Sequence, residues 1–86
     1  MISSVYILFS PSHNKIYIGY TSDLESRLLS HNQLALKGYT IRYRPWVLIH
    51  TEVFNTKLEA MKRERELKSG GGRKFIWELI RRGSGG

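Results

Sequence analysis

Two short apolar segments open the chain, separated by a cluster of turn-forming residues. Residues 5–9 (VYILF) are rich in β-branched and aromatic side chains, which favours a β-strand. Residues 15–20 (KIYIGY) predict a second strand, and residues 11–14 (PSHN) between them are typical of a turn. The pattern therefore predicts two antiparallel strands joined in a β-hairpin.

The register of this hairpin decides which side chains share a face of the sheet. If the turn is centred on its two middle residues, Tyr6 lies opposite Gly19 and Leu8 lies opposite Tyr17. Because successive side chains of a strand point to opposite faces, all four residues then lie on one face. A shift of one residue would move a tyrosine to the other face.

An amphipathic helix is predicted next, over about residues 23–36. Ser22 and Glu25 have the spacing of a capping box, which marks the start of a helix. Apolar residues recur at helical spacing and can face the core, with His31 at the edge of their stripe. This stripe contains Leu24, Leu28 and Ala35. Arg27 lies four residues before His31, so the two side chains project from the same side of the helix.

The second half of the chain predicts one more strand and two more helices. After a loop, residues 46–50 are apolar at successive positions, as expected of a strand that is covered on both faces. A second capping box at residues 56–59 predicts a helix that runs to about Lys68, where the glycines at 70–72 end it. Residues 73–82 carry apolar side chains at helical spacing and predict the last helix.

This order of elements, β-β-α-β-α-α, predicts an α+β fold with a small, mainly antiparallel three-stranded sheet flanked by helices. A chain of 86 residues makes one domain, expected at residues 1–82 with residues 83–86 as a flexible tail. The absence of cysteine excludes disulfides and thiolate metal sites. No apolar run approaches the roughly 20 residues that cross a bilayer, and the start of the chain lacks the basic segment of a signal peptide. We therefore expect a cytoplasmic protein with no membrane partner.

Charge adds the first indication of a partner. Fourteen Lys and Arg residues face seven Asp and Glu residues, which gives a net charge of +7 and an isoelectric point near 10.1. No acidic residue lies between Ser26 and Thr51, although this segment carries four basic ones. Such a charge is typical of a protein that binds a polyanion. The ordinary alternative is a basic protein whose charge serves only solubility.

Candidate chemistry begins with Glu64, which shares a helical stripe with small and apolar residues rather than with the basic residues around it. A carboxylate on a core-facing stripe is costly unless it is paired or bound to a metal ion. The simplest partner is Lys68, four residues later, in an ordinary helical ion pair. The stripe consists of Ala60, Met61, Glu64, Leu67 and Lys68.

Four further residues gather near the junction of the second strand and the first helix. Tyr6 and Tyr17 lie on paired strands, and Arg27 and His31 lie on the helix that follows. Each has an ordinary alternative: half-buried strand tyrosines are common, and an Arg–His pair four residues apart is often a solvated helix face. The combination with Glu64, in this order, is what favours a functional site.

At this point the chain resembles the GIY-YIG nuclease superfamily, and in particular the small stand-alone proteins similar to the nuclease domain of the DNA-repair excinuclease. The first motif is degenerate, with residues 4–6 (SVY) in place of Gly-Ile-Tyr, and the second is intact at residues 17–19 (YIG). The resemblance continues through Arg27 and His31, through residues 44–46 (RPW) and through residues 60–68, and covers about residues 4–80.

The resemblance implies a DNA endonuclease that hydrolyses phosphodiester bonds with one divalent ion, Mg²⁺ or Mn²⁺, and with no organic cofactor. Glu64 would be the main protein ligand of that ion, since Mg²⁺ keeps several waters and takes other ligands from substrate phosphate. Arg27 would contact the scissile phosphate. Tyr6 or Tyr17 would deprotonate or orient the attacking water, and His31 would assist a tyrosine or hold a phosphate. Gly19 would leave room for the phosphate backbone.

The basic residues outside this set are candidates for further phosphate contacts. They are Lys37, Arg42, Arg44, Arg73 and Lys74. Tyr39 and Trp46 are candidates for stacking on an unpaired base, although Trp46 lies beside Val47 and Leu48 as a core residue would.

Three functions remain open from the sequence. The first is an active DNA endonuclease, structure-selective or weakly selective, in repair or recombination, with site selection by its basic surface or by a protein partner. The second is a nucleic-acid-binding module that kept the fold and lost the chemistry; the degenerate first motif favours it. So does the absence of any asparagine after Glu64, where many family members have one. The third is a protein-interaction domain with an acidic partner.

Overall fold

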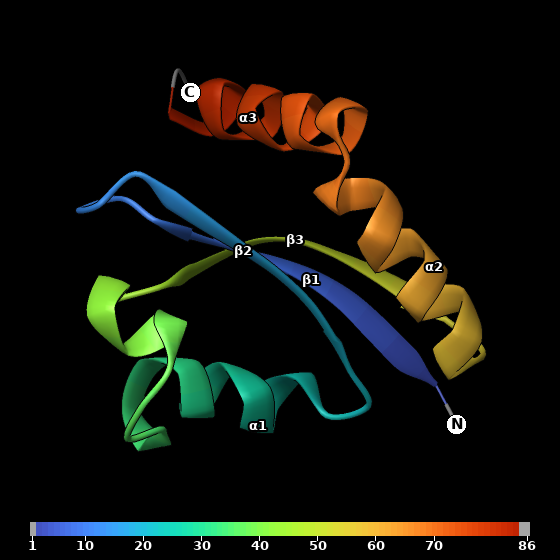
Figure 1. Cartoon of the computed structure of the whole chain (residues 1–86), viewed down its shortest axis with the longest axis horizontal. Coiled ribbons are helices and arrows are strands. Elements are labelled where there is room, and N and C mark those ends of the chain that lie inside the picture. The colour runs from blue at the N-terminus through green and yellow to red at the C-terminus, as the bar shows by residue number, and fades with distance from the viewer. Residues whose placement is uncertain (1, 85–86) are drawn as a thin grey trace.

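A computed structural model describes residues 2–84 of the chain, and residues 1 and 85–86 lie outside the described range. Its sheet has three strands, β1 (Ser3–Ser10), β2 (Lys15–Thr21) and β3 (Val47–Phe54). They are antiparallel and lie in the order β2-β1-β3, with β1 in the centre. The predicted α+β class and the order of the main elements are therefore confirmed (Figure 1).

The hairpin has the predicted register. Tyr6 pairs with Gly19 and Leu8 pairs with Tyr17, so the side chains of these residues share one face of the sheet. Asn14 closes the turn with a φ of 54°, a left-handed conformation that asparagine tolerates better than most residues.

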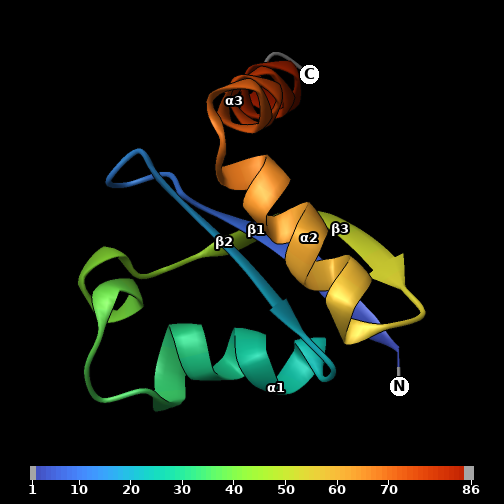
Figure 2. The ribbon, with the colours of Figure 1, turned by 45° about the vertical axis from the view of Figure 1, so that its right-hand side comes forward.

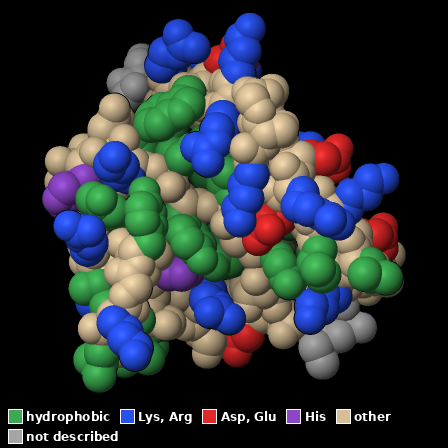
Figure 3. Space-filling view, viewed as in Figure 1, with side chains coloured by type: hydrophobic (Ala, Val, Ile, Leu, Met, Phe, Trp, Pro, Cys, Tyr) green, Lys and Arg blue, Asp and Glu red, His purple; other side chains and the backbone are tan. Residues whose placement is uncertain are grey.

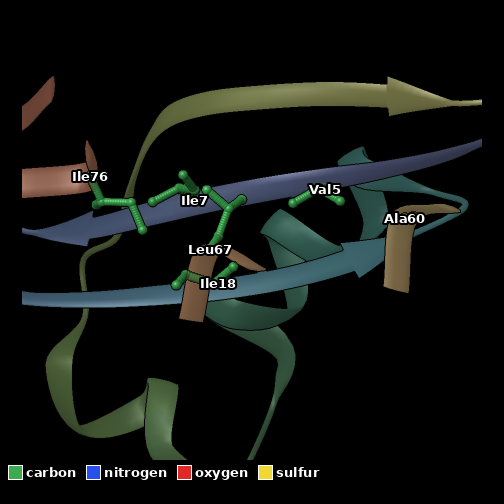
Figure 4. Close-up of a cluster of buried hydrophobic side chains, with 6 residues drawn as sticks. All are labelled: Val5, Ile7, Ile18, Ala60, Leu67 and Ile76. Carbon is green, nitrogen blue, oxygen red and sulfur yellow. The ribbon is translucent and has the colours of Figure 1, made fainter. Parts of the chain in front are cut away.

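Helices cover both faces of the sheet. Helix α1 (Leu24–Leu29) lies on one side, and α2 (Lys57–Lys68) and α3 (Gly70–Ser84) lie on the other (Figures 1 and 2). The alternation of side chains along β1 feeds both layers. The layer under α2 and α3 consists of Val5, Ile7, Ile18, Ala60, Leu67 and Ile76 (Figure 4). The layer over α1 consists of Tyr6, Leu8 and Trp46, packed by Tyr17, Leu24, Leu28 and Tyr43.

The first helical segment differs from the regular helix predicted at residues 23–36. Asp23, rather than Ser22, is the N-cap, and its Oδ1 accepts a hydrogen bond from the backbone N–H of Ser26. After α1 the chain widens into a π-helical segment, η1 (Ser30–Leu34). A 3₁₀-helix, η2 (Tyr39–Tyr43), then occupies part of the segment predicted to be a loop.

Strand β3 is an edge strand, so the prediction that it is covered on both faces is wrong. Val47, Leu48 and Val53 are all exposed. A continuous apolar run is typical of a central strand, but β1 occupies the centre because it pairs on both of its edges.

The three glycines predicted to end α2 belong to the first turn of α3 instead. Ser69 ends α2 with an extended backbone, and α3 begins directly after it. A Cβ at Gly72 would collide with the Cα of Leu67 and the carbonyl of Glu66, so glycine allows α3 to pack tightly on the last turn of α2. Helix α3 also runs through Ser84, which shortens the predicted tail of residues 83–86 to residues outside the described range.

Candidate active site

A cavity of about 650 Å³ opens where β1 begins and β2 ends, between α1 and the first turns of α2. Figure 2 shows the end of β2 in this position, with α1 and α2 on either side. Five of the sequence-predicted residues line it: Tyr6, Gly19 and Tyr17 from the sheet, Arg27 from α1 and Glu64 from α2. The fold thus brings together side chains from three distant parts of the chain.

Behind the cavity wall lies a buried chain of hydrogen bonds. The hydroxyl of Tyr6, which is 2% exposed, is 2.8 Å from Nε2 of His31. The other ring nitrogen of His31, Nδ1, is 3.1 Å from the hydroxyl of Thr40. His31 is itself only 7% exposed and packs against the ring of Tyr17, with centroids 4.7 Å apart. His31 therefore supports the tyrosines from behind and does not line the cavity.

Burial sets the protonation states of this chain. Burial of the Tyr6 hydroxyl, with the nearby Tyr17, raises the pKa of Tyr6 well above its usual range. Burial, followed by the positive charges of Arg27 and Arg44, lowers the pKa of His31. A neutral imidazole has one donor and one acceptor nitrogen, so one of the two hydroxyls donates to the ring and the other accepts from it.

Gly19 is required by Tyr6 rather than by a ligand. A Cβ at Gly19 would lie 2.5 Å from the Tyr6 hydroxyl oxygen and 3.1 Å from Cε1 of Tyr17. The space above Gly19 is therefore filled by a tyrosine side chain, which corrects the expectation that it admits a phosphate backbone.

Glu64 reaches the cavity from the first half of α2 with 17% of its side chain exposed. Its Oε1 is 3.4 Å from Nζ of Lys68, so the helical ion pair expected from the sequence is present. Its companions on the stripe, Ala60 and Leu67, are fully buried. Glu64 is thus a carboxylate at the border between the core and the cavity.

The donor set around Glu64 fits a hard cation with few protein ligands. Among residues 2–84 no group of three or more His, Asp or Glu side chains has the arrangement of a metal site. A single carboxylate beside the hydroxyls of Tyr17 and Ser22 suits Mg²⁺, which retains much of its water shell. Glu64 is the residue that would hold such an ion.

The predicted phosphate-contact residues have different fates. Arg44 is committed to the fold: its Nε donates to the carbonyl of His31 at 2.6 Å, and its Nη2 donates to the carbonyls of Ser30 and Ala35. It is therefore a structural residue, not a free phosphate contact. The other four lie outside the cavity. They are Lys37, Arg42, Arg73 and Lys74, and all of them are exposed.

The two aromatic candidates for base stacking also separate. Trp46 is buried, and its Nε1 donates to the carbonyl of Thr40 at 2.8 Å, so it belongs to the core. Tyr39 is exposed and is therefore the candidate that a base could reach.

Sequence reasoning missed two residues of the site. Lys57, in the first turn of α2, lines the cavity two helical turns before Glu64. The i, i+7 spacing, which returns to the same side of a helix, was the available signal. Thr40 had no such signal, since only the folded chain brings η2 behind the helix that carries His31.

No helix within residues 2–84 combines the length and the apolar character that a membrane span needs.

Comparison with known proteins gives a consistent result. The sequence profile of the GIY-YIG catalytic domain matches residues 2–75. A UPF0213 protein of Staphylococcus haemolyticus is 45% identical over 56 residues, which cover 65% of this chain and 68% of the relative. A UPF0213 protein of Natronomonas pharaonis is 42% identical over 65 residues, covering 76% of this chain and 75% of the relative.

A solved structure supports the fold. The solution NMR structure of a UPF0213 protein from Bacillus halodurans is 33% identical and superimposes with a TM-score of 0.55, covering 92% of this chain and 85% of that one. With the profile match across most of the sequence, the conclusion is direct: this chain belongs to the GIY-YIG family.

Proposed function

We propose that this protein is a metal-dependent DNA endonuclease that hydrolyses phosphodiester bonds at the cavity between α1 and α2. The observation that carries the proposal is the convergence of two phenols, a guanidinium and a carboxylate on one cavity. These are the groups that phosphodiester hydrolysis needs: an activated water, a cation for the phosphate and a ligand for a metal ion.

Arg27 is the residue assigned to the scissile phosphate. Its side chain is exposed and lines the cavity, and its planar guanidinium can donate to two phosphate oxygens at once. It would offset the charge that develops on these oxygens in the transition state. Lys57, on the opposite wall, supplies a second positive charge for a neighbouring phosphate.

Tyr17 is the tyrosine assigned to the attacking water. Tyr6 is buried and its hydroxyl is held by His31, whereas Tyr17 is only half-buried and lines the same cavity. Tyr6 and His31 are then positioning residues that fix the ring of Tyr17. Glu64 would hold a Mg²⁺ or Mn²⁺ ion, which when bound supplies Lewis acidity at the phosphate and lowers the pKa of water.

The proposal is tested with a panel of labelled linear, nicked, flapped and branched DNAs, incubated with Mg²⁺ or Mn²⁺ and with chelator. Wild-type protein is expected to cut at least one substrate only when the metal is present. Arg27→Ala is expected to lose about 10²- to 10³-fold in rate while its circular dichroism spectrum stays unchanged, because Arg27 is exposed.

The matched control is Arg42→Ala, which removes an exposed arginine outside the cavity and is expected to cut at close to the wild-type rate. Normal cutting by Arg27→Ala would remove this residue from the mechanism. Binding without cutting on every substrate would identify a nucleic-acid-binding module, or an enzyme that requires a protein partner.

A further inference from the structure

The ion pair between Glu64 and Lys68 places a cation on the carboxylate that the proposed function assigns to the metal. Nζ of Lys68 is 3.4 Å from Oε1 of Glu64. Glu64 is mostly buried, while 49% of the Lys68 side chain is exposed. The two partners therefore differ in freedom: Glu64 is fixed at the cavity, and Lys68 can swing into solvent on its flexible stem.

A lysine in this position opposes a divalent ion. A metal ion on Glu64 and an ammonium group on the same carboxylate would lie within a few ångströms of each other, and like charges at that distance repel even in water. An exposed helical ion pair is weak, so the lysine can leave at low cost. Arg27 and Lys57 also add positive charge to the cavity, but neither forms the close contact with Glu64 that Lys68 does.

DNA offers Lys68 an alternative partner. A phosphate backbone in the cavity would present negative charge close to Glu64, where an exposed lysine gains more from a phosphate than from a carboxylate that a metal ion has neutralised. Departure of the lysine frees Oε1 at the moment when the substrate arrives.

We propose that Lys68 is a competing cation that occupies Glu64 in the free protein and moves to a DNA phosphate when the metal binds, so that DNA and metal bind cooperatively. The inference rests on the proposed function, in which Glu64 is the metal ligand. It makes Lys68 a residue that sets metal affinity rather than one that only stabilises α2.

The test uses Mn²⁺ binding to DNA-free protein, measured from the loss of the electron paramagnetic resonance signal of free Mn²⁺. Lys68→Met removes the charge and keeps the length and helix propensity of the side chain. It is expected to bind Mn²⁺ about five- to tenfold more tightly than the wild type, the size expected for removing one positive charge a few ångströms from a divalent ion in water.

The matched control is Lys62→Met, which removes an equal charge from an exposed position on the far side of α2 from Glu64. It is expected to change Mn²⁺ affinity less than twofold. Equal effects of the two variants, or no effect of Lys68→Met, would overturn the inference, because Lys68 would then act only through net charge or not at all.

Two further measurements separate this inference from the proposed function. Glu64→Gln is expected to lose Mn²⁺ binding; wild-type affinity in that variant would instead remove Glu64 as the metal ligand. A cleavage-resistant phosphorothioate duplex is expected to tighten Mn²⁺ binding to the wild type, and to do so less in Lys68→Met, because the coupling is reciprocal. An equal gain in both proteins would show that Lys68 does not link DNA to metal.

Discussion

At the scale of single residues, the cavity depends on a tyrosine that is held from both sides. Tyr6 packs on the bare backbone of Gly19 and is hydrogen-bonded to His31. His31 is in turn held by Thr40. Each contact is buried, so the loss of one leaves a polar group without a partner or forces a ring to move.

Gly19 gives a prediction of opposite sign to that of another glycine. Gly19→Ala is expected to lower the free energy of unfolding by about 1–3 kcal/mol, because the new methyl group would overlap the Tyr6 side chain. Gly71→Ala is expected to raise it by about 0.5–1 kcal/mol, since Gly71 lies in α3 with open space around it. Urea denaturation of both variants measures this. A Gly19→Ala variant as stable as the wild type would contradict the packing described here.

His31 gives a pH dependence of stability. Because its pKa is lowered in the folded state, the unfolded chain binds a proton at His31 more readily than the folded chain does. This contribution to stability is fully present above the ordinary histidine pKa of about 6.5 and is lost as the pH falls below it. Urea denaturation of wild type and His31→Gln between pH 5 and 8 should show a shallower pH slope below about 6.5 in the variant. Identical slopes would show that His31 does not contribute to the pH dependence.

The candidate site was predictable from the sequence where it depends on periodicity. The helical stripe placed Glu64 beside Ala60 and Leu67, and the hairpin register placed Tyr6 opposite Gly19. Arg44 was misassigned because a sequence pattern does not reveal backbone carbonyls that lack partners. That requirement appears only when the chain ends a helix irregularly.

At the scale of elements, the irregular end of α1 explains this use of Arg44. In the π-helical segment η1, the N–H of Ala35 bonds to the carbonyl of Ser30. The carbonyls of Ser30, His31 and Ala35 all accept from the Arg44 side chain, which ties η1 to the start of β3. Regular helix propensity predicted none of this, and it likewise missed that glycines 70–72 form a first helical turn.

Removal of Arg44 should therefore act on the fold. Arg44→Ala is expected to destabilise the protein by about 2–3 kcal/mol, because three carbonyls lose a charged donor. Arg42→Ala, two residues earlier and exposed, is expected to change stability by less than about 0.5 kcal/mol. Thermal and urea denaturation provide the comparison. Equal stabilities of the two variants would return Arg44 to the set of candidate phosphate contacts.

At the scale of the whole molecule, positive charge is spread widely over the surface. Figure 3 shows Lys and Arg side chains across the whole of the face it draws, with fewer Asp and Glu side chains among them. The net charge of +7 agrees with this view. A polyanion is therefore attracted to the molecule as a whole, whereas the cavity decides where it reacts.

DNA binding is accordingly expected to depend steeply on salt. A complex with about three phosphate contacts, such as Arg27, Lys57 and Lys68 provide around the cavity, loses roughly 40-fold in affinity between 50 and 200 mM salt. Fluorescence anisotropy in chelator measures this slope, which Lys57→Ala should lower by about one contact. An affinity that hardly changes with salt would favour a protein partner with a neutral surface over DNA.

The most direct test of the central claim is single-turnover cleavage by wild type and Glu64→Gln, on the best substrate of the panel, across a titration of Mg²⁺. The account predicts metal-dependent cutting by the wild type and a loss of about 10²-fold or more in Glu64→Gln, with folding and DNA binding retained. Cutting by Glu64→Gln at the wild-type rate, or cutting by the wild type in chelator, would contradict a metal-dependent active site at this cavity.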